Sequence, residues 1–107
     1  MNSIKKSNPK RVGLPRASDF AKSFIKDWER LTHSGRYNLQ NLKDTMALIV
    51  ANAGGLPPEY RDHELVGEWA DHRECHVGGD FLLIYRYPDK GSVSFVRAGT
   101  HSELFGG

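Results

Sequence analysis

The 107 residues fit a single domain with one hydrophobic core. Charged residues make up 26% and aromatic residues 10%, which is typical of a globular protein and argues against wholesale disorder. The one cysteine excludes an internal disulfide and a multi-cysteine zinc module, and the formal net charge of +2 favours polyanionic partners only slightly.

The chain is expected to begin with a flexible arm and a short strand. Residues 1–8 are polar and lack the apolar core of a signal peptide. No run approaches 18 apolar residues, so we expect a cytoplasmic protein without a membrane span. Residues 10–16 (KRVGLPR) are expected to form a strand that Gly13 and Pro15 keep short and at a sheet edge.

Two amphipathic helices are predicted next. Ser18 and Asp19 offer a start for the first helix, and Gly35 offers a stop. Its apolar residues share one helical face: Phe20, Phe24, Trp28 and Leu31. Asn38 can cap the second helix, and the Gly-Gly pair at 54–55 ends it. Its apolar residues recur every three to four positions: Leu39, Leu42, Met46, Ile49, Val50 and Ala53.

From Trp69 onward the apolar period is two, which predicts β-strands. A hairpin turn follows at 78–79, and Phe81 to Tyr87 is expected to be the central strand. After a turn at 88–91, a third strand covers Ser92 to Gly99. The order predicts an α+β fold in one domain over residues 1–107, with two N-terminal helices on one face of an antiparallel sheet.

Titratable residues gather in this last third of the chain. His72, Glu74 and His76 share a face if their strand is regular, while His63 lies in the loop before the sheet. Further along the chain come Asp80, just past the hairpin turn, Arg97 on the last strand, and His101 beyond its end. Imidazoles can accept and donate protons near neutral pH, an aspartate can orient one of them, and arginine can hold phosphoryl charge. The set suits cleavage of RNA, whose own 2′-hydroxyl is the nucleophile, without a metal or cofactor.

Other interpretations remain open for these residues. His72 and His76 stand four apart, but on a strand and without the adjacent glutamate of the zincin pattern, and the P-C-x-x-C of zinc deaminases is absent. A histidine-based metal site or histidines that only hydrogen-bond in loops are the alternatives. Cys75 alternates with the histidine side of its strand, so we expect a buried apolar role rather than a nucleophile.

Four segments within residues 56–106 carry a family resemblance. They are LPPEYRDHELVGEW, then R-x-x-HV-x-x-D before an aromatic residue, LLIYRY, and F-x-RAGTHSELF. Together they closely resemble the YafQ branch of the RelE-type toxins, which are ribosome-dependent mRNA endonucleases of type II toxin–antitoxin pairs. The resemblance implies two helices packed on a small twisted antiparallel sheet. It also implies mRNA cleavage in the ribosomal A site, leaving a 2′,3′-cyclic phosphate and a 5′-hydroxyl.

The resemblance also implies roles for individual residues. The catalytic set would be His63, His76, Asp80 and His101, with His101 or His76 as the base for the 2′-hydroxyl. Substrate contacts are expected from Phe105, Phe81, Arg73 and Arg97, although Phe81 stands where relatives have Trp. His72 falls where an aromatic residue is common, and we do not count it as catalytic.

The expected partners are the ribosome, mRNA and a cognate antitoxin, through which the complex would bind operator DNA. A gyrase inhibitor of the ParE type, which cleaves nothing, is the alternative within the same fold class. The histidine and aspartate set argues against it, because an inhibitor needs no acid or base.

Overall fold

The computed structural model describes residues 13–106. Its elements are strand β1 (Ala17–Phe20), helices α1 (Lys22–Ser34) and α2 (Leu39–Ala51), the 3-10 turn η2 (Pro58–Tyr60), strand β2 (His63–Glu64), the 3-10 turn η3 (Gly67–Trp69), strands β3 (Arg73–Gly78), β4 (Phe81–Arg86) and β5 (Ser92–Thr100), and helix α3 (His101–Phe105). The α+β class is as predicted. None of the helices within residues 13–106 has the length and apolar character that a membrane crossing needs.

The strands form one five-stranded sheet in the order β1-β5-β4-β3-β2. β3, β4 and β5 are antiparallel neighbours, as predicted, and β2 adds a short antiparallel edge. β1 pairs with β5 in parallel, so the sheet is mixed rather than purely antiparallel. The predicted arm at 1–8 and the first part of the strand predicted at 10–16 lie outside the described residues, and 13–16 is not a strand.

The first helix begins later than predicted. Ser18 and Asp19 do not start it, because they pair with Val93 and Ser94 in the sheet. Helix α1 starts at Lys22, without a side-chain cap, and ends at the left-handed Gly35 as predicted. Pairing with β5 therefore overrides the local capping preference of these two residues.

The second helix starts where its cap was expected. The Asn38 side chain accepts a hydrogen bond from the Asn41 backbone N–H at 3.2 Å. The helix ends at Ala51, since Asn52 takes the left-handed conformation with φ 56°, ahead of the predicted glycine stop.

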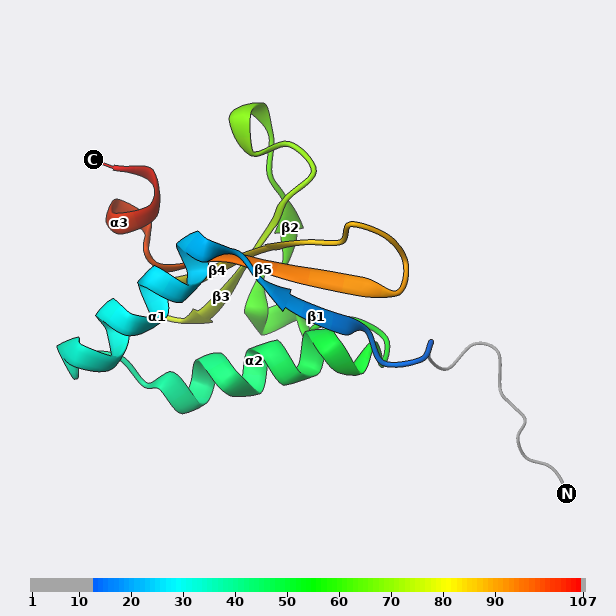
Figure 1. The fold of residues 1–107 in the computed structure, drawn as a ribbon, viewed down its shortest axis with the longest axis horizontal. Coiled ribbons are helices and arrows are strands. Elements are labelled where there is room, and N and C mark those ends of the chain that lie inside the picture. Colours follow the sequence, from blue (N-terminus) through cyan, green and yellow to red (C-terminus); the bar gives the residue numbers. More distant parts are fainter. Residues whose placement is uncertain (1–12, 107) are drawn as a thin grey trace, which may run out of the picture.

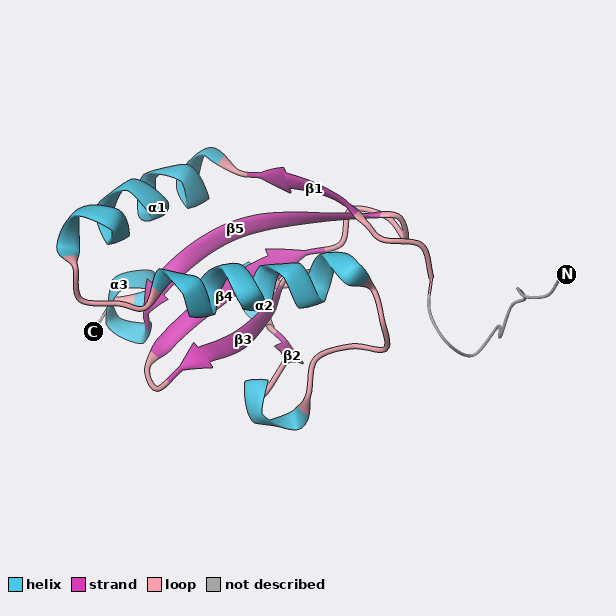
Figure 2. Ribbon diagram, turned by 90° about the horizontal axis from the view of Figure 1, so that it is seen from below, coloured by secondary structure: helices cyan, strands magenta, loops and turns pink. Residues whose placement is uncertain are grey.

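Both long helices cover one face of the sheet (Figures 1 and 2), and the main core lies between them and the strands. Cys75 is fully buried in this core, as predicted. On the opposite face a smaller cluster joins Leu82 and Ile84 to Leu104 of α3. In Figure 1, α3 and the segment between η2 and η3 lie on the side of the sheet away from α2.

β3 is shorter than the period-two pattern suggested. Trp69 closes the turn η3, and Asp71 has a positive φ of 71°, so the strand begins only at Arg73. His72 therefore lies outside the strand, while Glu74 and His76 remain on one face of it, opposite Cys75.

Candidate active site

The register of the sheet places three of the four predicted catalytic residues around one end of β3, β4 and β5, whereas His63 pairs with Glu74 near the start of β3. His76 lies opposite Leu82, which lies opposite Gly99. Asp80 directly precedes β4, and His101 directly follows β5. Because neighbouring strands are about 4.8 Å apart, β3 and β5 are separated by about 10 Å. A nucleotide can span such a separation, so one phosphodiester is within reach of both sides.

His63 is held by two oxygen atoms. Its Nδ1 lies 2.7 Å from the carbonyl oxygen of Arg61, and its Nε2 lies 3.4 Å from Oε1 of Glu74. Glu74 is only 7% exposed, and His63 lies opposite it in the β2–β3 pairing. The Glu74 carboxylate is thus close enough to form an ion pair with the His63 ring when that ring is protonated.

His76 is half-buried and borders a cavity of about 580 Å³ along the edge of β3 that β2 leaves unpaired. Asn41 and Asp44 of α2 and Glu59 to Arg61 form the other walls of this cavity. The other three predicted catalytic residues do not line it. His76 therefore stands between a polar cavity and the open face that carries the rest of the set.

Asp80 is exposed in the turn between β3 and β4. Within the described chain its carboxylate has no hydrogen-bond or ion-pair partner, so it does not orient His76 or His101 in this structure. It is free to meet a ligand or a protonated imidazole that moves towards it.

Helix α3 carries two of the predicted site residues in a single capped turn. His101 is its first residue and Phe105 its last, and their ring centroids are 5.0 Å apart. Thr100 and Glu103 cap the helix reciprocally: the Thr100 side chain accepts from the Glu103 N–H, and the Glu103 side chain accepts from the Thr100 N–H. The exposed imidazole and the phenyl ring are therefore presented together.

Phe105 also contacts Trp69 of η3. The two rings meet edge to face with centroids 5.9 Å apart, and Trp69 also contacts His72 edge-on at 5.2 Å. Trp69 and Phe105 thus form an aromatic row, and His72 supports it through its contact with Trp69.

Three predicted substrate contacts have structural partners. Phe81 is 5% exposed on the helix face and stacks on Tyr37, with centroids 4.9 Å apart, so a base cannot stack on it here. Arg73 donates from Nε and Nη2 to Asp62, which also accepts from the Tyr85 hydroxyl.

Arg97 donates from Nε and Nη2 to the Asp27 carboxylate at 2.7 and 3.2 Å. That hydrogen bond raises the pKa of Arg97, so the guanidinium stays charged. Its third nitrogen, Nη1, has no hydrogen-bond partner among the described residues. Of the predicted arginines, Arg97 therefore keeps one nitrogen for a ligand, whereas Nη1 of Arg73 lies 3.7 Å from the Glu64 carboxylate.

Sequence reasoning left two supporting residues out of the predicted site. Glu74 was placed on the His76 face without a partner, and only the pairing of β2 with β3 reveals its contact with His63. Trp69 was assigned to a strand, and only the turn at η3 brings it against Phe105. Both contacts join segments whose proximity no local pattern encodes.

The described residues contain no group of three or more His, Cys, Asp or Glu side chains close enough to hold a metal ion. The site as described is thus an open surface of three imidazoles, one carboxylate and an aromatic row. Its groups can exchange protons with a bound ligand and stack on a base.

Comparisons with known proteins agree on a single family. A family model described as the bacterial toxin of a type II toxin–antitoxin system, YafQ, matches residues 16–106. The chain is 37% identical over 93 residues to the mRNA interferase toxin YafQ of Escherichia coli strain K12, an alignment that covers 87% of this chain and 99% of that protein.

Solved structures agree with the sequence comparison. The crystal structure of YafQ from E. coli strain BL21(DE3) is similar with a TM-score of 0.77 and 34% identity, over 85% of this chain and 99% of that chain. The E. coli DinJ-YafQ toxin-antitoxin complex contains a chain similar with a TM-score of 0.76 and 34% identity, over 87% of this chain and 100% of that chain.

Proposed function

Because this chain belongs to the YafQ family of type II toxin–antitoxin toxins, we propose that it is an endoribonuclease that stops translation by cutting mRNA in the ribosomal A site. The observation that carries this proposal is the gathering of His76, Asp80 and His101 around one end of the sheet, with the His101 imidazole and the Phe105 ring on one helical turn. A proton-transfer group and a stacking ring are the two things that metal-independent cleavage of a single strand needs.

The proposed reaction is an in-line transesterification. The 2′-hydroxyl oxygen attacks the adjacent phosphorus, and the bond from phosphorus to the 5′-oxygen of the next nucleotide breaks. His101 or His76 takes the proton of the 2′-hydroxyl, and a protonated imidazole returns one to the leaving 5′-oxygen. The products are a 2′,3′-cyclic phosphate and a 5′-hydroxyl.

His63 suits the cationic role in this scheme, because its Nε2 lies 3.4 Å from the carboxylate of the buried Glu74. As the proton donor, or as a fixed positive charge, it would stabilise the developing phosphoryl charge. Asp80 would favour a neighbouring imidazolium once substrate draws the groups together. Arg97 would contact a phosphate through Nη1, and Phe105 would stack on a base.

The partners follow from the same assignment. We infer that the chain works in the cytoplasm on translating ribosomes, and that a cognate antitoxin neutralises it, as the DinJ-YafQ complexes of E. coli suggest. Operator DNA would be bound only by the toxin–antitoxin complex.

Growth arrest in cells tests the proposal. We expect induction of the wild-type chain to stop growth and His101→Ala to abolish this effect while the protein stays folded. His33→Ala is the matched control, since His33 is an exposed histidine on α1 whose one hydrogen bond among residues 13–106 is to the Glu29 carbonyl of its own helix. A fully toxic His101→Ala contradicts the assignment, and inhibition of gyrase supercoiling by the purified protein would favour the ParE-type alternative.

A further inference from the structure

Helix α3 is too short to be stable alone. It has five residues, and isolated helices of this length do not form in water. Its orientation is therefore set by its contacts with the rest of the chain. Leu104 anchors it in the small cluster on the open face of the sheet, and Phe105 packs against the same cluster and against Trp69, so both apolar contacts come from the last two residues of the helix.

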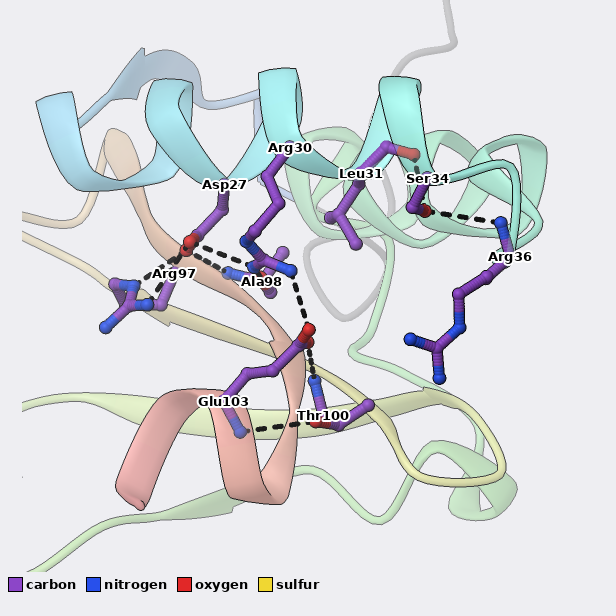
Figure 3. A network of polar contacts seen from close by, with 9 residues as sticks. All are labelled: Asp27, Arg30, Leu31, Ser34, Arg36, Arg97, Ala98, Thr100 and Glu103. Atoms are coloured by element: carbon purple, nitrogen blue, oxygen red, sulfur yellow. Dashed lines mark hydrogen bonds and ion pairs between the residues drawn. The ribbon is translucent and has the colours of Figure 1, made fainter.

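A polar contact holds Glu103, in the middle of α3, and it comes from helix α1. Figure 3 shows the Arg30 guanidinium between α1, β5 and α3. Its Nη1 donates to Oε2 of Glu103 at 2.8 Å, and its Nη2 donates to the carbonyl oxygen of Ala98 and to Oδ1 of Asp27, both at 3.1 Å. One planar, always charged group thus joins α1 to β5 and α3, two consecutive elements near the other end of the chain.

Asp27 holds the Arg30 guanidinium in place through a hydrogen bond. It is 4% exposed and accepts from Arg97, Arg30 and the Ala98 backbone N–H. Burial opposes its ionisation, but these hydrogen bonds outweigh it and hold the pKa of Asp27 below its usual value. Asp27 is therefore an anion at neutral pH, and its contacts tie Arg30 to the same strand that ends at α3.

The sheet makes room for this bridge at Gly99. A Cβ atom there would lie 2.8 Å from Oε1 of Glu103, 3.2 Å from Nη2 of Arg30 and 3.3 Å from Cδ2 of Leu104. The absence of a side chain lets the guanidinium and the α3 carboxylate settle directly on the strand. The contact thus lies directly between β5 and α3, the helix that carries His101.

We propose that Arg30 is a positioning residue which, through Glu103, holds α3 in the orientation that presents His101 and Phe105 to the RNA. The inference rests on the proposed ribonuclease function and deepens it. Arg30 touches neither ring itself, so its effect must pass through the helix. A displacement of about 1 Å in a catalytic group can lower a rate about 100-fold, whereas a half-exposed ion pair adds little to overall stability. The Arg30 and Glu103 side chains are 39% and 31% exposed, so the contact can be removed without unfolding the chain.

The first test compares Arg30→Met with Lys26→Met. Lys26 is exposed on the same helix, and no ion pair is formed by it within residues 13–106, so its variant removes the same charge without touching α3. With ribosome-bound mRNA as substrate, we expect Arg30→Met to lower kcat about tenfold and to change KM less than about twofold. Lys26→Met should behave as wild type, and Arg30→Lys should recover part of kcat.

The local stability of α3 on the sheet is measured separately by amide hydrogen exchange. In Arg30→Met the backbone N–H groups of Glu103 and Gly106, which donate to the Thr100 side chain and to the Ser102 carbonyl, should exchange about tenfold faster, while the melting temperature falls by less than about 5 °C. Glu103→Gln should act in the same way, because its amide keeps an acceptor for Thr100 but turns an N–H group towards Arg30. The double variant Arg30→Met, Glu103→Gln should have a kcat no lower than that of the worse single variant.

Unchanged exchange in α3, a wild-type kcat in Arg30→Met, an equal loss in Lys26→Met, or a rise in KM at constant kcat would each overturn the positioning role. If the wild-type chain itself cuts no message, the proposed function is wrong. The hydrogen-exchange data on the same variants then still decide whether Arg30 holds α3 in place.

Discussion

At the scale of single residues, Asp27 has the greatest predicted effect on stability. Replacing it with Asn removes a buried anion and leaves the Arg97 guanidinium and the Ala98 N–H with a poorer acceptor. Breaking a buried ion pair on one side costs about 3 kcal/mol or more. We expect Asp27→Asn to lower the free energy of unfolding by about 3 kcal/mol in urea titrations. A loss within error of an exposed substitution such as Lys26→Met would contradict the role given to this carboxylate.

Cys75 gives a second prediction at this scale. The residue has no exposed surface, and burial raises the pKa of its thiol well above the usual value. Alternation along its strand was enough to predict this burial. We expect the native protein to leave a thiol reagent unreacted at neutral pH and to react fully once unfolded. Rapid labelling of the folded chain would show that Cys75 is accessible.

At the scale of elements, two helix caps form a natural pair for comparison. Asn38 caps α2 and Thr100 caps α3, and removing either side chain should cost about 1 kcal/mol of stability. Only Thr100 lies on the helix that carries His101. We therefore expect Thr100→Ala to lower mRNA cleavage about tenfold or more, and Asn38→Ala to leave it within about twofold of wild type. Equal activities of the two variants would show that the orientation of α3 does not matter.

What could be predicted from the sequence depended on how local each feature is. The Asn38 cap, the β4 strand and the burial of Cys75 follow from short patterns, and the structure agrees with them. Ser18 has equally good capping chemistry but lies in β1, because its backbone pairs with β5 near the other end of the chain. A preference worth about 1 kcal/mol yields to such long-range pairing.

The same limit applied to the site. The histidines could be gathered from sequence because β3, β4 and α3 are consecutive or nearly so. The contacts that hold them, from Glu74 to His63 and from Arg30 to Glu103, cross between distant segments, and no spacing rule predicts them. The structure also gives Phe81 and Arg73 the partners that a search for substrate contacts could not foresee.

At the scale of the whole molecule, acid should destabilise the fold through two carboxylates. Hydrogen bonds and nearby arginines outweigh burial and hold the pKa values of Asp27 and Glu103 below their usual 3.8 and 4.5. A group whose pKa is lowered by folding contributes stability above its unfolded pKa and loses it as the pH falls towards its folded pKa.

The free energy of unfolding should therefore decrease as the pH falls below about 4.5, and the decrease should be smaller in Glu103→Gln than in wild type. Urea titrations between neutral pH and pH 3 measure this difference. Parallel pH profiles for the two proteins would show that Glu103 has no such lowered pKa in the folded chain.

The central claim is that this surface cuts mRNA on the ribosome, and mapping of cleavage sites tests it most directly. Purified protein is incubated with a defined mRNA, with and without programmed ribosomes, and the new 5′ ends are located by primer extension, with His101→Ala in parallel. The account predicts cuts at fixed codon positions, only in the presence of ribosomes, and none with His101→Ala. Cuts on free mRNA would overturn the A-site mechanism, and no cuts under either condition would contradict the ribonuclease assignment itself.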